Sequence, residues 1–492
     1  MLNVTEKEKK QVLYFVFALV VALNIWLAFW HVFFRDETQA WLIARDTSLR
    51  ADSLFEVTSY EGHPFFWFVL LMPFAKAGFS SVTLKVMSWL FCTMALYVFM
   101  FKVETSFYIK IIAAISPMFV CFNVVPARSY SVAVFFVTIL MALINNKKNR
   151  PILYGIILAL LLQTLLIYGG FVFACCLVWL FEVLEDVKNK RIDLRSFLFN
   201  LFGLSIVFIS ALFLLWEFRF TSEIVGNENI QSMSFYLKNV VYQLVYGNKL
   251  LFGDYFILAC CCIGVALFIL RKNTAAVKAF VILICGIGFQ VYIYAFVYYN
   301  DHHRVISWLF ILLYVMNVLY LEYNDKNNMF CRIIIGLIVF LLALNTSYSC
   351  DVILNELNPN LVFSQSRQLA IAINNLPENA AVFISSTDAD TSVVAQVDRK
   401  HSVYSPFTRN LASYRNRDPK YIEKMDYQTF IRTACEMFPD YDEIYVIVQP
   451  DDVTIYNLMD VIDQGYETIE VVYRPDIDSY AVENFYLVRI KL

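Results

Sequence analysis

The fold of this chain is decided by one stretch, Phe33-Phe34-Arg35-Asp36-Glu37-Thr38-Gln39-Ala40-Trp41-Leu42-Ile43-Ala44-Arg45, which follows the first long apolar segment. Its two adjacent carboxylates, Asp36 and Glu37, stand where a hydrophobic span meets water. Ionisable groups at such a boundary are costly to hold unless they bind, coordinate or deprotonate something. We therefore interpret this stretch as a catalytic site, closed by Glu61-Gly62-His63-Pro64.

A structural role for the same carboxylates is the main alternative. Asp36 stands three residues before Gln39, at the start of a segment rich in apolar residues, and this spacing is typical of a helix N-cap. The two interpretations are compatible, because a capping position also fixes a carboxylate at a helix start near the membrane surface.

Composition indicates the class of protein. The chain has 492 residues, of which 59% are hydrophobic and 16% are charged, whereas soluble globular proteins carry about 25% charged residues. The net charge of -3 is unevenly distributed along the chain. Residues 351–492 hold 22 acidic and 12 basic side chains, whereas residues 1–350 hold 20 acidic and 27 basic side chains. We predict a polytopic α-helical membrane protein with a basic membrane part and an acidic tail.

Eleven segments have, or nearly have, the roughly 20 apolar residues that a membrane span requires. They lie near 12–34, 82–101, 109–126, 129–145, 151–168, 170–184, 197–216, 252–270, 277–299, 305–322 and 330–348. The distribution of Lys and Arg favours a cytoplasmic N-terminus, provided that 64–77 does not span. We predict an interfacial or re-entrant helix over 64–77, with Pro64 in its first turn. Residues 35–81 then form one long extracytoplasmic loop.

The composition changes at Cys350 to that of a soluble domain. Strands are predicted at 381–385, 443–448, 466–473 and 485–490, and helical spacing is found at 427–438 and 453–463. We therefore predict a transmembrane domain over 1–348 and a soluble α/β domain over 349–492, which an odd number of spans places outside the membrane. Cys350 and Cys435 can pair in such a domain, although two cysteines alone do not establish a disulfide.

Other loops on the predicted outer face carry positive groups. Arg128 follows a span directly, so its guanidinium must reach water, lipid headgroups or an anionic ligand. Asp301-His302-His303-Arg304 suits anion binding better than zinc binding, because adjacent histidines on a helix point apart. Glu61 and His63 offer further ligands or a proton acceptor, and a helix-start role is the alternative for His63. Such a face suits deprotonation of a hydroxyl while a lipid phosphate leaves.

The first loop resembles a known signature. Arg35–Arg45, followed by Glu61-Gly62-His63-Pro64-Phe65-Phe66-Trp67, resembles the first loop of the C-type (GT-C) membrane glycosyltransferases, which include protein O-mannosyltransferases and the lipid A aminoarabinose transferase. Arg128-Ser129-Tyr130 resembles an Arg-x-Tyr segment of bacterial members, and His303-Arg304 resembles their late cationic segment. The resemblance covers roughly residues 1–348 and implies a GT-C-like fold.

The resemblance implies an activity and residue roles. It implies transfer of a sugar, with inversion, from a polyprenyl phosphate to a glycan, lipid or protein acceptor on the outer face of a bacterial cell membrane. Asp36 would be the base or a metal ligand, supported by Glu37. The residues implied to hold the lipid phosphate are Arg128, His303 and Arg304, and Glu61, His63 and Tyr130 complete the predicted substrate-binding set.

Three alternatives stay open at this point. A divalent cation held by Asp36 and Glu37 is the first, although some family members carry a further acidic residue where this chain has Arg128, which argues against a metal. A transporter or flippase for a lipid-linked glycan is the second, although the repeated halves typical of transporters are not visible. A non-catalytic envelope assembly protein is the third. No basic patch indicates nucleic acid as a partner.

Overall fold

The computed structural model describes residues 5–50, 53–121, 123–219, 235, 238, 263–264, 269, 274–293, 304–323, 329–358, 362–386, 390–416, 424–450, 455–464, 468–475, 479 and 483–492. The chain divides into two compact units. The helical unit comprises Met1–Trp26, Gly62–Phe66 and Ser88–Val352, and the loop–sheet unit comprises Leu27–Glu61, Trp67–Met87 and Ile353–Leu492. Most of the first loop therefore folds together with the C-terminal region.

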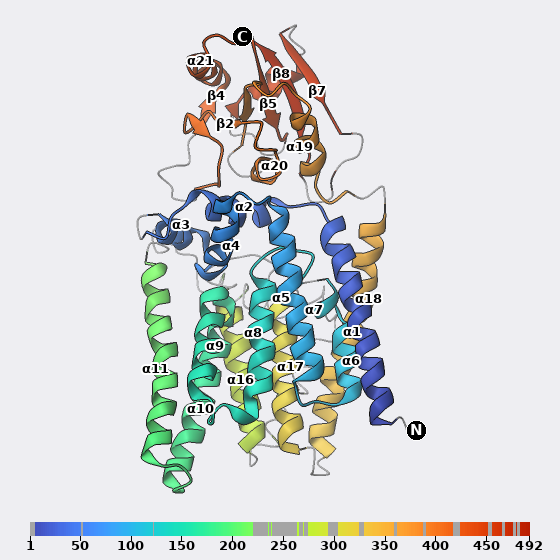
Figure 1. The fold of residues 1–492 in the computed structure, drawn as a ribbon, viewed down its shortest axis with the longest axis vertical. Coiled ribbons are helices and arrows are strands. Elements are labelled where there is room, and N and C mark those ends of the chain that lie inside the picture. Colours follow the sequence, from blue (N-terminus) through green and yellow to red (C-terminus); the bar gives the residue numbers. More distant parts are fainter. Residues whose placement is uncertain are drawn as a thin grey trace. The chain divides into compact units, whose positions relative to one another are not determined.

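Helices form most of the chain before residue 358 (Figure 1). The longer and connecting helices are α1 (Glu6–Trp30), α5 (Val82–Phe101), α6 (Phe107–Ile115), α7 (Pro117–Val120), α8 (Tyr130–Leu143), α9 (Pro151–Thr164), α10 (Gly169–Lys188), α11 (Leu194–Glu217), α16 (Thr274–Tyr292), α17 (Arg304–Tyr323) and α18 (Met329–Leu357). Within the described residues, five helical segments are long and apolar enough to cross a membrane: α1, α5, α11, α16, and α10 with the turn before it. These segments support a multi-pass membrane protein.

The predicted count of eleven spans is not confirmed. Segment 252–270 lies largely outside the described residues, and the single span predicted over 109–126 is wrong. There α6 ends at Ile115 and α7 begins at Pro117. Proline has no N–H to donate and its ring clashes with the preceding turn, so α6 does not continue through it. The Ser116 hydroxyl donates to the Ala113 carbonyl oxygen at 2.7 Å, which satisfies one carbonyl at the end of α6.

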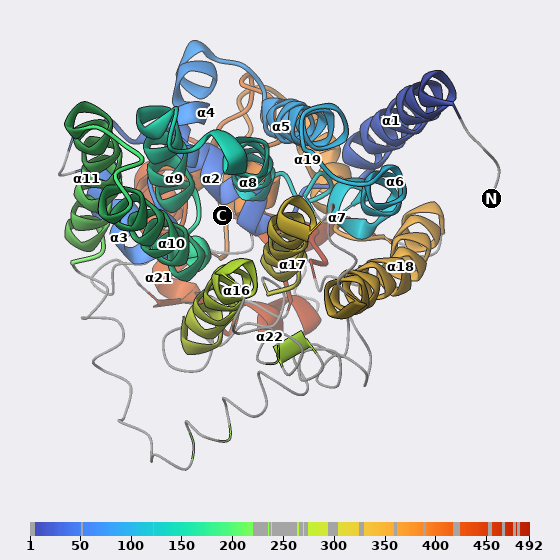
Figure 2. The same cartoon turned by 90° about the horizontal axis from the view of Figure 1, so that it is seen from below.

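Close helix contacts organise the helical unit. Helix α9 packs against α11, and α16 packs against both α10 and α17 (Figure 2). A Cβ added to Gly155 of α9 would collide with the Gly203 carbonyl of α11. Small residues allow this close approach of two backbones, which is the usual way that helices associate in a membrane.

Short helices occupy the first loop. They are α2 (Arg35–Asp46), α3 (Leu54–Glu61) and α4 (Phe66–Ala77). The helix predicted over 64–77 is present as α4, but it begins at Phe66, so Pro64 precedes it and is not in its first turn. Helix α18 continues to Leu357, beyond the predicted domain boundary at 348.

A six-stranded mixed sheet forms the C-terminal region, with strand order β3-β2-β1-β5-β8-β7. Its strands are β1 (Val382–Ile384), β2 (Val403–Ser405), β3 (Asn410–Leu411), β5 (Glu443–Val448), β7 (Ile469–Tyr473) and β8 (Tyr486–Lys491). Strand β1 is parallel to β2 and β5, whereas β8 is antiparallel to β5 and β7. A small second sheet pairs β4 (Met425–Asp426) with β6 (Ile455–Tyr456). The four predicted strands are confirmed as β1, β5, β7 and β8.

The helices of this region are α19 (Ser366–Asn374), α20 (Thr391–Val394), α21 (Tyr427–Met437) and α22 (Leu458–Asp463). The helix predicted over 427–438 is confirmed as α21. The helix predicted over 453–463 is partly wrong, because strand β6 precedes α22. Cys350 and Cys435 are both free, so the disulfide that they could form is not present.

The first loop shares the hydrophobic core of the sheet. Along β1, Val382 and Ile384 belong to one buried cluster and Phe383 to another, as expected for a strand covered on both faces. Leu42 of α2 is fully buried in the cluster of Val382 and Ile384, and α2 also contacts α20. The core of the C-terminal region therefore includes a helix from the first loop.

Candidate functional site

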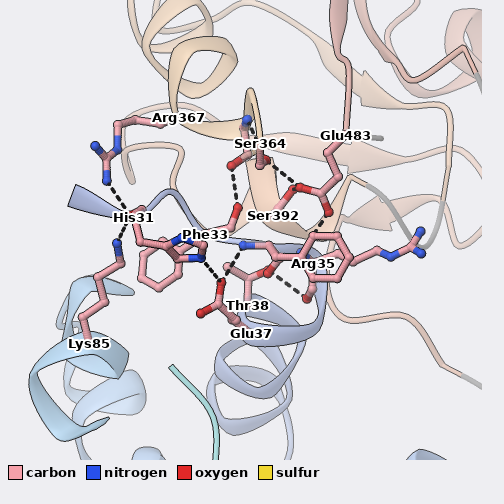
Figure 3. A network of polar contacts seen from close by, with 12 residues as sticks. His31, Phe33, Arg35, Glu37, Thr38, Lys85, Ser364, Arg367, Ser392 and Glu483 are labelled. Atoms are coloured by element: carbon pink, nitrogen blue, oxygen red, sulfur yellow. Dashed lines mark hydrogen bonds and ion pairs between the residues drawn. The ribbon is translucent and has the colours of Figure 1, made fainter. Parts of the chain in front are cut away.

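The two adjacent carboxylates of α2 have different surroundings. Phe34 is the N-cap of α2, and its N–H donates to Glu37 Oε2 at 2.7 Å (Figure 3). A carboxylate three residues after the N-cap reaches back in this way in a capping box. The prediction that Asp36 itself is the cap is therefore wrong, since Asp36 is the second residue of the helix and Glu37 makes the capping contact.

Glu37 is turned into the protein. Its side chain is only 3% exposed, and its Oε2 lies 3.7 Å from Nε2 of the equally buried His31. The His31 carbonyl accepts hydrogen bonds from the Lys85 ammonium and from the Arg367 guanidinium, the latter at 3.1 Å. The Lys85 ammonium also lies 4.4 Å from the ring centroid of Phe33. Buried charges of both signs thus surround the segment that leads into α2.

A carboxylate from the C-terminal region holds the first residue of α2. The Arg35 N–H donates to Glu483 Oε1 at 3.0 Å, and Glu483 Oε2 accepts from Ser364 at 2.6 Å and from Ser392 at 3.3 Å (Figure 3). Burial raises the pKa of Glu483 to about 7, because desolvation penalises its charged form. Glu483 fixes the backbone immediately before Asp36. It was not predicted from the sequence.

Asp36 is the partly exposed carboxylate of the pair. It lies between Arg35, whose N–H is bound by Glu483, and Glu37, whose carboxylate caps the helix. The positive end of the helix dipole lies at this first turn and stabilises an ionised carboxylate there. The local structure therefore fixes the backbone of Asp36 from both sides.

Glu61 joins the same unit as Asp36 through Gln39. The Gln39 side-chain amide donates to Glu61 Oε1 at 2.7 Å and to the Arg415 carbonyl at 2.6 Å. The Gln39 side-chain oxygen accepts from the Arg415 N–H at 2.9 Å. One glutamine therefore connects α2 to the end of α3 and to the C-terminal region.

The predicted residues His63, Arg128 and Tyr130 lie together in the helical unit. The Arg128 guanidinium is 2.7 Å from His63 Nε2, and its central carbon lies 5.4 Å from the ring centroid of Tyr130. Tyr130 is buried and begins α8, whereas Arg128 and His63 are partly exposed. The Arg128 N–H also donates to the Pro126 carbonyl at 2.8 Å, which holds the turn before α8. Two separate loops thus place a guanidinium, an imidazole and an aromatic ring in contact.

Two further residues predicted to hold the lipid phosphate, His303 and Arg304, have side chains outside the described part of the structure. His303 lies outside the described residues, and Arg304 is the first residue of α17 with a side chain that is not described.

A divalent cation at Asp36 and Glu37 stays a prediction. Among the described residues, no group of three or more His, Cys, Asp or Glu side chains is arranged to hold a metal ion. Glu37 is already bonded to the Phe34 N–H and faces His31. Hard cations take six or more oxygen ligands, several of them from the protein in a dedicated site.

Comparison with known proteins identifies related structures but no related sequence. The crystal structure of ArnT from Cupriavidus metallidurans bound to undecaprenyl phosphate matches at 11% identity over 99% of this chain and 98% of that chain, with a TM-score of 0.44. The Archaeoglobus fulgidus oligosaccharyltransferase tethered to an acceptor peptide containing the NVT sequon matches at 12% identity over 89% of this chain and 69% of that chain, with a TM-score of 0.36.

A second structure of the archaeal oligosaccharyltransferase, in complex with Zn and sulfate, matches at 12% identity over 88% of this chain and 67% of that chain, with a TM-score of 0.39. No protein-family model and no curated protein sequence matches the chain. At these identities and TM-scores, we rest the proposals below on the residues of this chain.

Proposed function

We propose that this chain is a membrane glycosyltransferase that moves a sugar from a polyprenyl-phosphate donor to an acceptor hydroxyl at the extracytoplasmic face of a bacterial cell membrane. The contact between His63 and Arg128, beside Tyr130, is the observation that carries the proposal. A guanidinium presents a planar fork of donors that matches the oxygens of a phosphate. The imidazole beside it adds a second nitrogen that can donate to an anion.

The proposed reaction has one proton transfer and one substitution. The Asp36 carboxylate takes the proton of the acceptor hydroxyl, and the resulting oxygen attacks the anomeric carbon of the sugar. The bond between that carbon and the phosphate oxygen breaks, and polyprenyl phosphate leaves with the bonding electron pair. Attack opposite the leaving group inverts the anomeric configuration. Arg128 stabilises the negative charge that develops on the departing phosphate.

Asp36 is preferred to Glu37 as the base because of their surroundings. Glu37 is buried and its carboxylate is bonded to the backbone N–H of Phe34. A base must come within hydrogen-bond reach of the proton that it removes, and a partly exposed carboxylate meets this requirement more readily. We assign to Glu37 the supporting role of fixing the start of α2.

Two further features support the proposal. The apolar helices suit a lipid-linked donor, because a polyprenyl chain is soluble only in the bilayer. The concentration of Lys and Arg in alternate loops supports an extracytoplasmic position for the first loop. The acceptor belongs to the glycans, lipids or proteins of the cell envelope, and His303 and Arg304 are proposed as further phosphate ligands.

The test is release of polyprenyl phosphate by the purified full chain in nanodiscs. A panel of synthetic undecaprenyl-phosphate hexoses and pentoses would be offered together with an envelope extract as the acceptor. We expect Asp36→Asn to lower the rate by roughly 10²- to 10⁴-fold, the usual contribution of a general base. Asp442→Asn is the matched control, because Asp442 is an exposed aspartate in the C-terminal region.

Two outcomes would contradict the proposal. An unchanged rate in the Asp36→Asn variant at equal protein level would reject Asp36 as the base. Movement of an intact lipid-linked sugar between leaflets, without release of polyprenyl phosphate, would favour the flippase alternative.

A further inference from the structure

A cavity of about 420 Å³ lies within the loop–sheet unit. Its walls come from the end of α1 and the turn after it, from α2, from the turn between α4 and α5, and from the segments around α19 and α20. None of the residues predicted for catalysis or substrate binding lines it. The cavity is therefore separate from the groups assigned to sugar transfer.

The lining of the cavity carries an excess of positive charge. Arg45, Lys85, Arg367 and Arg399 contribute cations, and Asp398 contributes an acidic side chain. Arg45 forms an ion pair with Asp46 at 2.7 Å. The Arg367 guanidinium donates to main-chain carbonyl oxygens, which are neutral and do not balance its formal charge.

An anion in the cavity would offset the free-energy cost of desolvating the Arg367 guanidinium. Burial lowers the pKa of Arg367, because desolvation disfavours its charged form. The Arg367 guanidinium donates to the carbonyls of His31 at 3.1 Å and Phe29 at 3.5 Å. Bonds to charged partners are about twice as strong as bonds to neutral ones. A phosphate is thus a better partner for this guanidinium than the carbonyls alone.

Apolar side chains indicate that the anion belongs to a lipid. Phe29, Phe33, Trp41, Phe79 and Val82 add an apolar wall to the cavity. Three of these are exposed: Phe29 at the end of α1 is 40% exposed, Phe79 is 58% exposed, and Val82 at the start of α5 is 44% exposed. Both helices are long and apolar enough to cross a membrane. Exposed apolar groups at the ends of such helices are suited to contact lipid chains.

We propose that this cavity binds the phosphate headgroup of a membrane lipid, with the lipid chain lying against the exposed apolar side chains at the ends of α1 and α5. Basic pockets beside membrane helices bind anionic headgroups through this combination of charge and apolar surface. The site goes beyond the proposed sugar transfer and does not depend on it.

Arg399 connects the C-terminal region to the turn after α4. Gly78 in that turn has φ +90°, and a Cβ added there would collide with the Arg399 guanidinium. Glycine adopts this backbone conformation without the steric cost that other residues meet. A lipid phosphate at Arg399 would therefore bind this turn and the C-terminal region together and stabilise the loop–sheet unit.

The test uses the purified full chain in a mild detergent. Phosphatidylglycerol, phosphatidylcholine and undecaprenyl phosphate are added in turn, and bound lipid is counted by native mass spectrometry alongside the melting temperature. We expect phosphatidylglycerol to bind and to raise the melting temperature, and phosphatidylcholine, whose net charge is zero, to bind more weakly. High salt should weaken binding of the anionic lipid, because the Arg399 side chain is exposed to solvent.

Variants localise the site. We expect Arg367→Ala with Arg399→Ala to lower the affinity for phosphatidylglycerol by roughly 10- to 100-fold, the effect of losing a charge-assisted hydrogen bond. Arg432→Ala is the matched control, because Arg432 is an exposed arginine on α21 that does not line the cavity. If the double variant melts early without lipid, Arg399→Ala alone replaces it, since that side chain is exposed.

The outcomes separate two sources of the phosphate. If undecaprenyl phosphate displaces phosphatidylglycerol from the wild type, and the Arg367→Ala, Arg399→Ala variant binds neither lipid, the occupant is a polyprenyl lipid. If phosphatidylglycerol stays bound in the presence of undecaprenyl phosphate, the occupant is a bilayer phospholipid. Equal binding of the anionic and zwitterionic lipids, or unchanged affinity in the Arg399→Ala variant, would overturn the proposal.

Discussion

The start of α2 and the His63–Arg128 pair hold charged side chains in different ways. At α2, the carboxylates of Glu37 and Glu483 accept main-chain N–H groups and are buried. In the helical unit, two basic side chains contact each other across separate loops and remain partly exposed. A carboxylate that is bonded to the main chain fixes the backbone, whereas a guanidinium in contact with an imidazole has further N–H groups that can donate to an anion.

This difference distinguishes residues that fix the backbone from residues that can contact a substrate. Glu37 and Glu483 lie close to Asp36 in structure, yet both have contacts that account for their burial without a substrate. Asp36 and Arg128 keep partial exposure, which a group that meets a substrate requires. Variants of the two regions should therefore change different measurements, and three predictions follow from this contrast.

The largest effect is expected at Glu483 and is on stability. Its folded pKa of about 7 lies above the usual glutamate pKa of 4.5, so the folded state binds the proton more tightly than the unfolded state. The stability from this group is complete below pH 4.5 and is lost as the pH rises through 7, by on the order of 3 kcal/mol. Glu483→Gln should abolish this pH dependence while keeping an acceptor for the Arg35 N–H.

Amide hydrogen exchange of the segment 31–46 between pH 5 and pH 8, corrected for intrinsic exchange, measures this effect. Asp442→Asn, which alters an exposed carboxylate in the same region, should leave the profile unchanged. If wild type and Glu483→Gln show the same pH profile, Glu483 does not titrate as its burial indicates.

A smaller effect, on binding, is expected at Arg128. Arg128→Ala should weaken binding of undecaprenyl phosphate by roughly 10- to 100-fold, because a charge-assisted hydrogen bond is lost. Arg128→Lys should restore only part of the affinity, since the ammonium keeps the charge but not the planar fork. Arg219→Ala, at an exposed arginine at the end of α11, is the control. Equal affinity in all four proteins would exclude Arg128 from the phosphate site.

The smallest effect is expected at Glu37. Glu37→Ala should destabilise the start of α2 by about 1 kcal/mol, the usual loss when a helix cap is removed. Glu37→Gln keeps an oxygen for the Phe34 N–H and should retain most of the transfer activity. Hydrogen exchange at Phe34 measures the stability of the start of α2, and the rate of polyprenyl-phosphate release measures the transfer activity. A loss of activity in Glu37→Gln as large as in Asp36→Asn would assign the chemistry to Glu37 instead.

Much of the fold is readable from local pattern. Strand β5 was predicted from a continuous apolar run, whereas strand β8 and helix α21 were predicted from the period of their residues. Strands β2, β3, β4 and β6 contain two or three residues each and were not predicted, whereas β1, which also has three residues, was predicted from the apolar run at 381–385. The break at Pro117 coincides with a residue that was visible in the sequence, since proline lacks an N–H to donate and its ring clashes with the preceding turn. Helix α4, by contrast, continues through Pro73.

The residues of the candidate site were also predicted only in part. His63, Arg128 and Tyr130 were predicted as substrate-binding residues, and they are in contact; their role stays a prediction. Glu483 was missed because no motif marks it and 448 residues separate it from Arg35. A single glutamate in an acidic tail of 22 acidic residues carries no signal of its own.

The amino-acid sequence by itself determined that the chain has a long apolar helical part, a C-terminal α/β region and two adjacent carboxylates in its first loop. Only the tertiary structure decided which carboxylate is turned inward and that the C-terminal region holds the first loop. Apolar periodicity acts between neighbours along the chain, so a sequence shows it directly. The partner of a buried charge is chosen by desolvation and hydrogen bonding after distant segments have met.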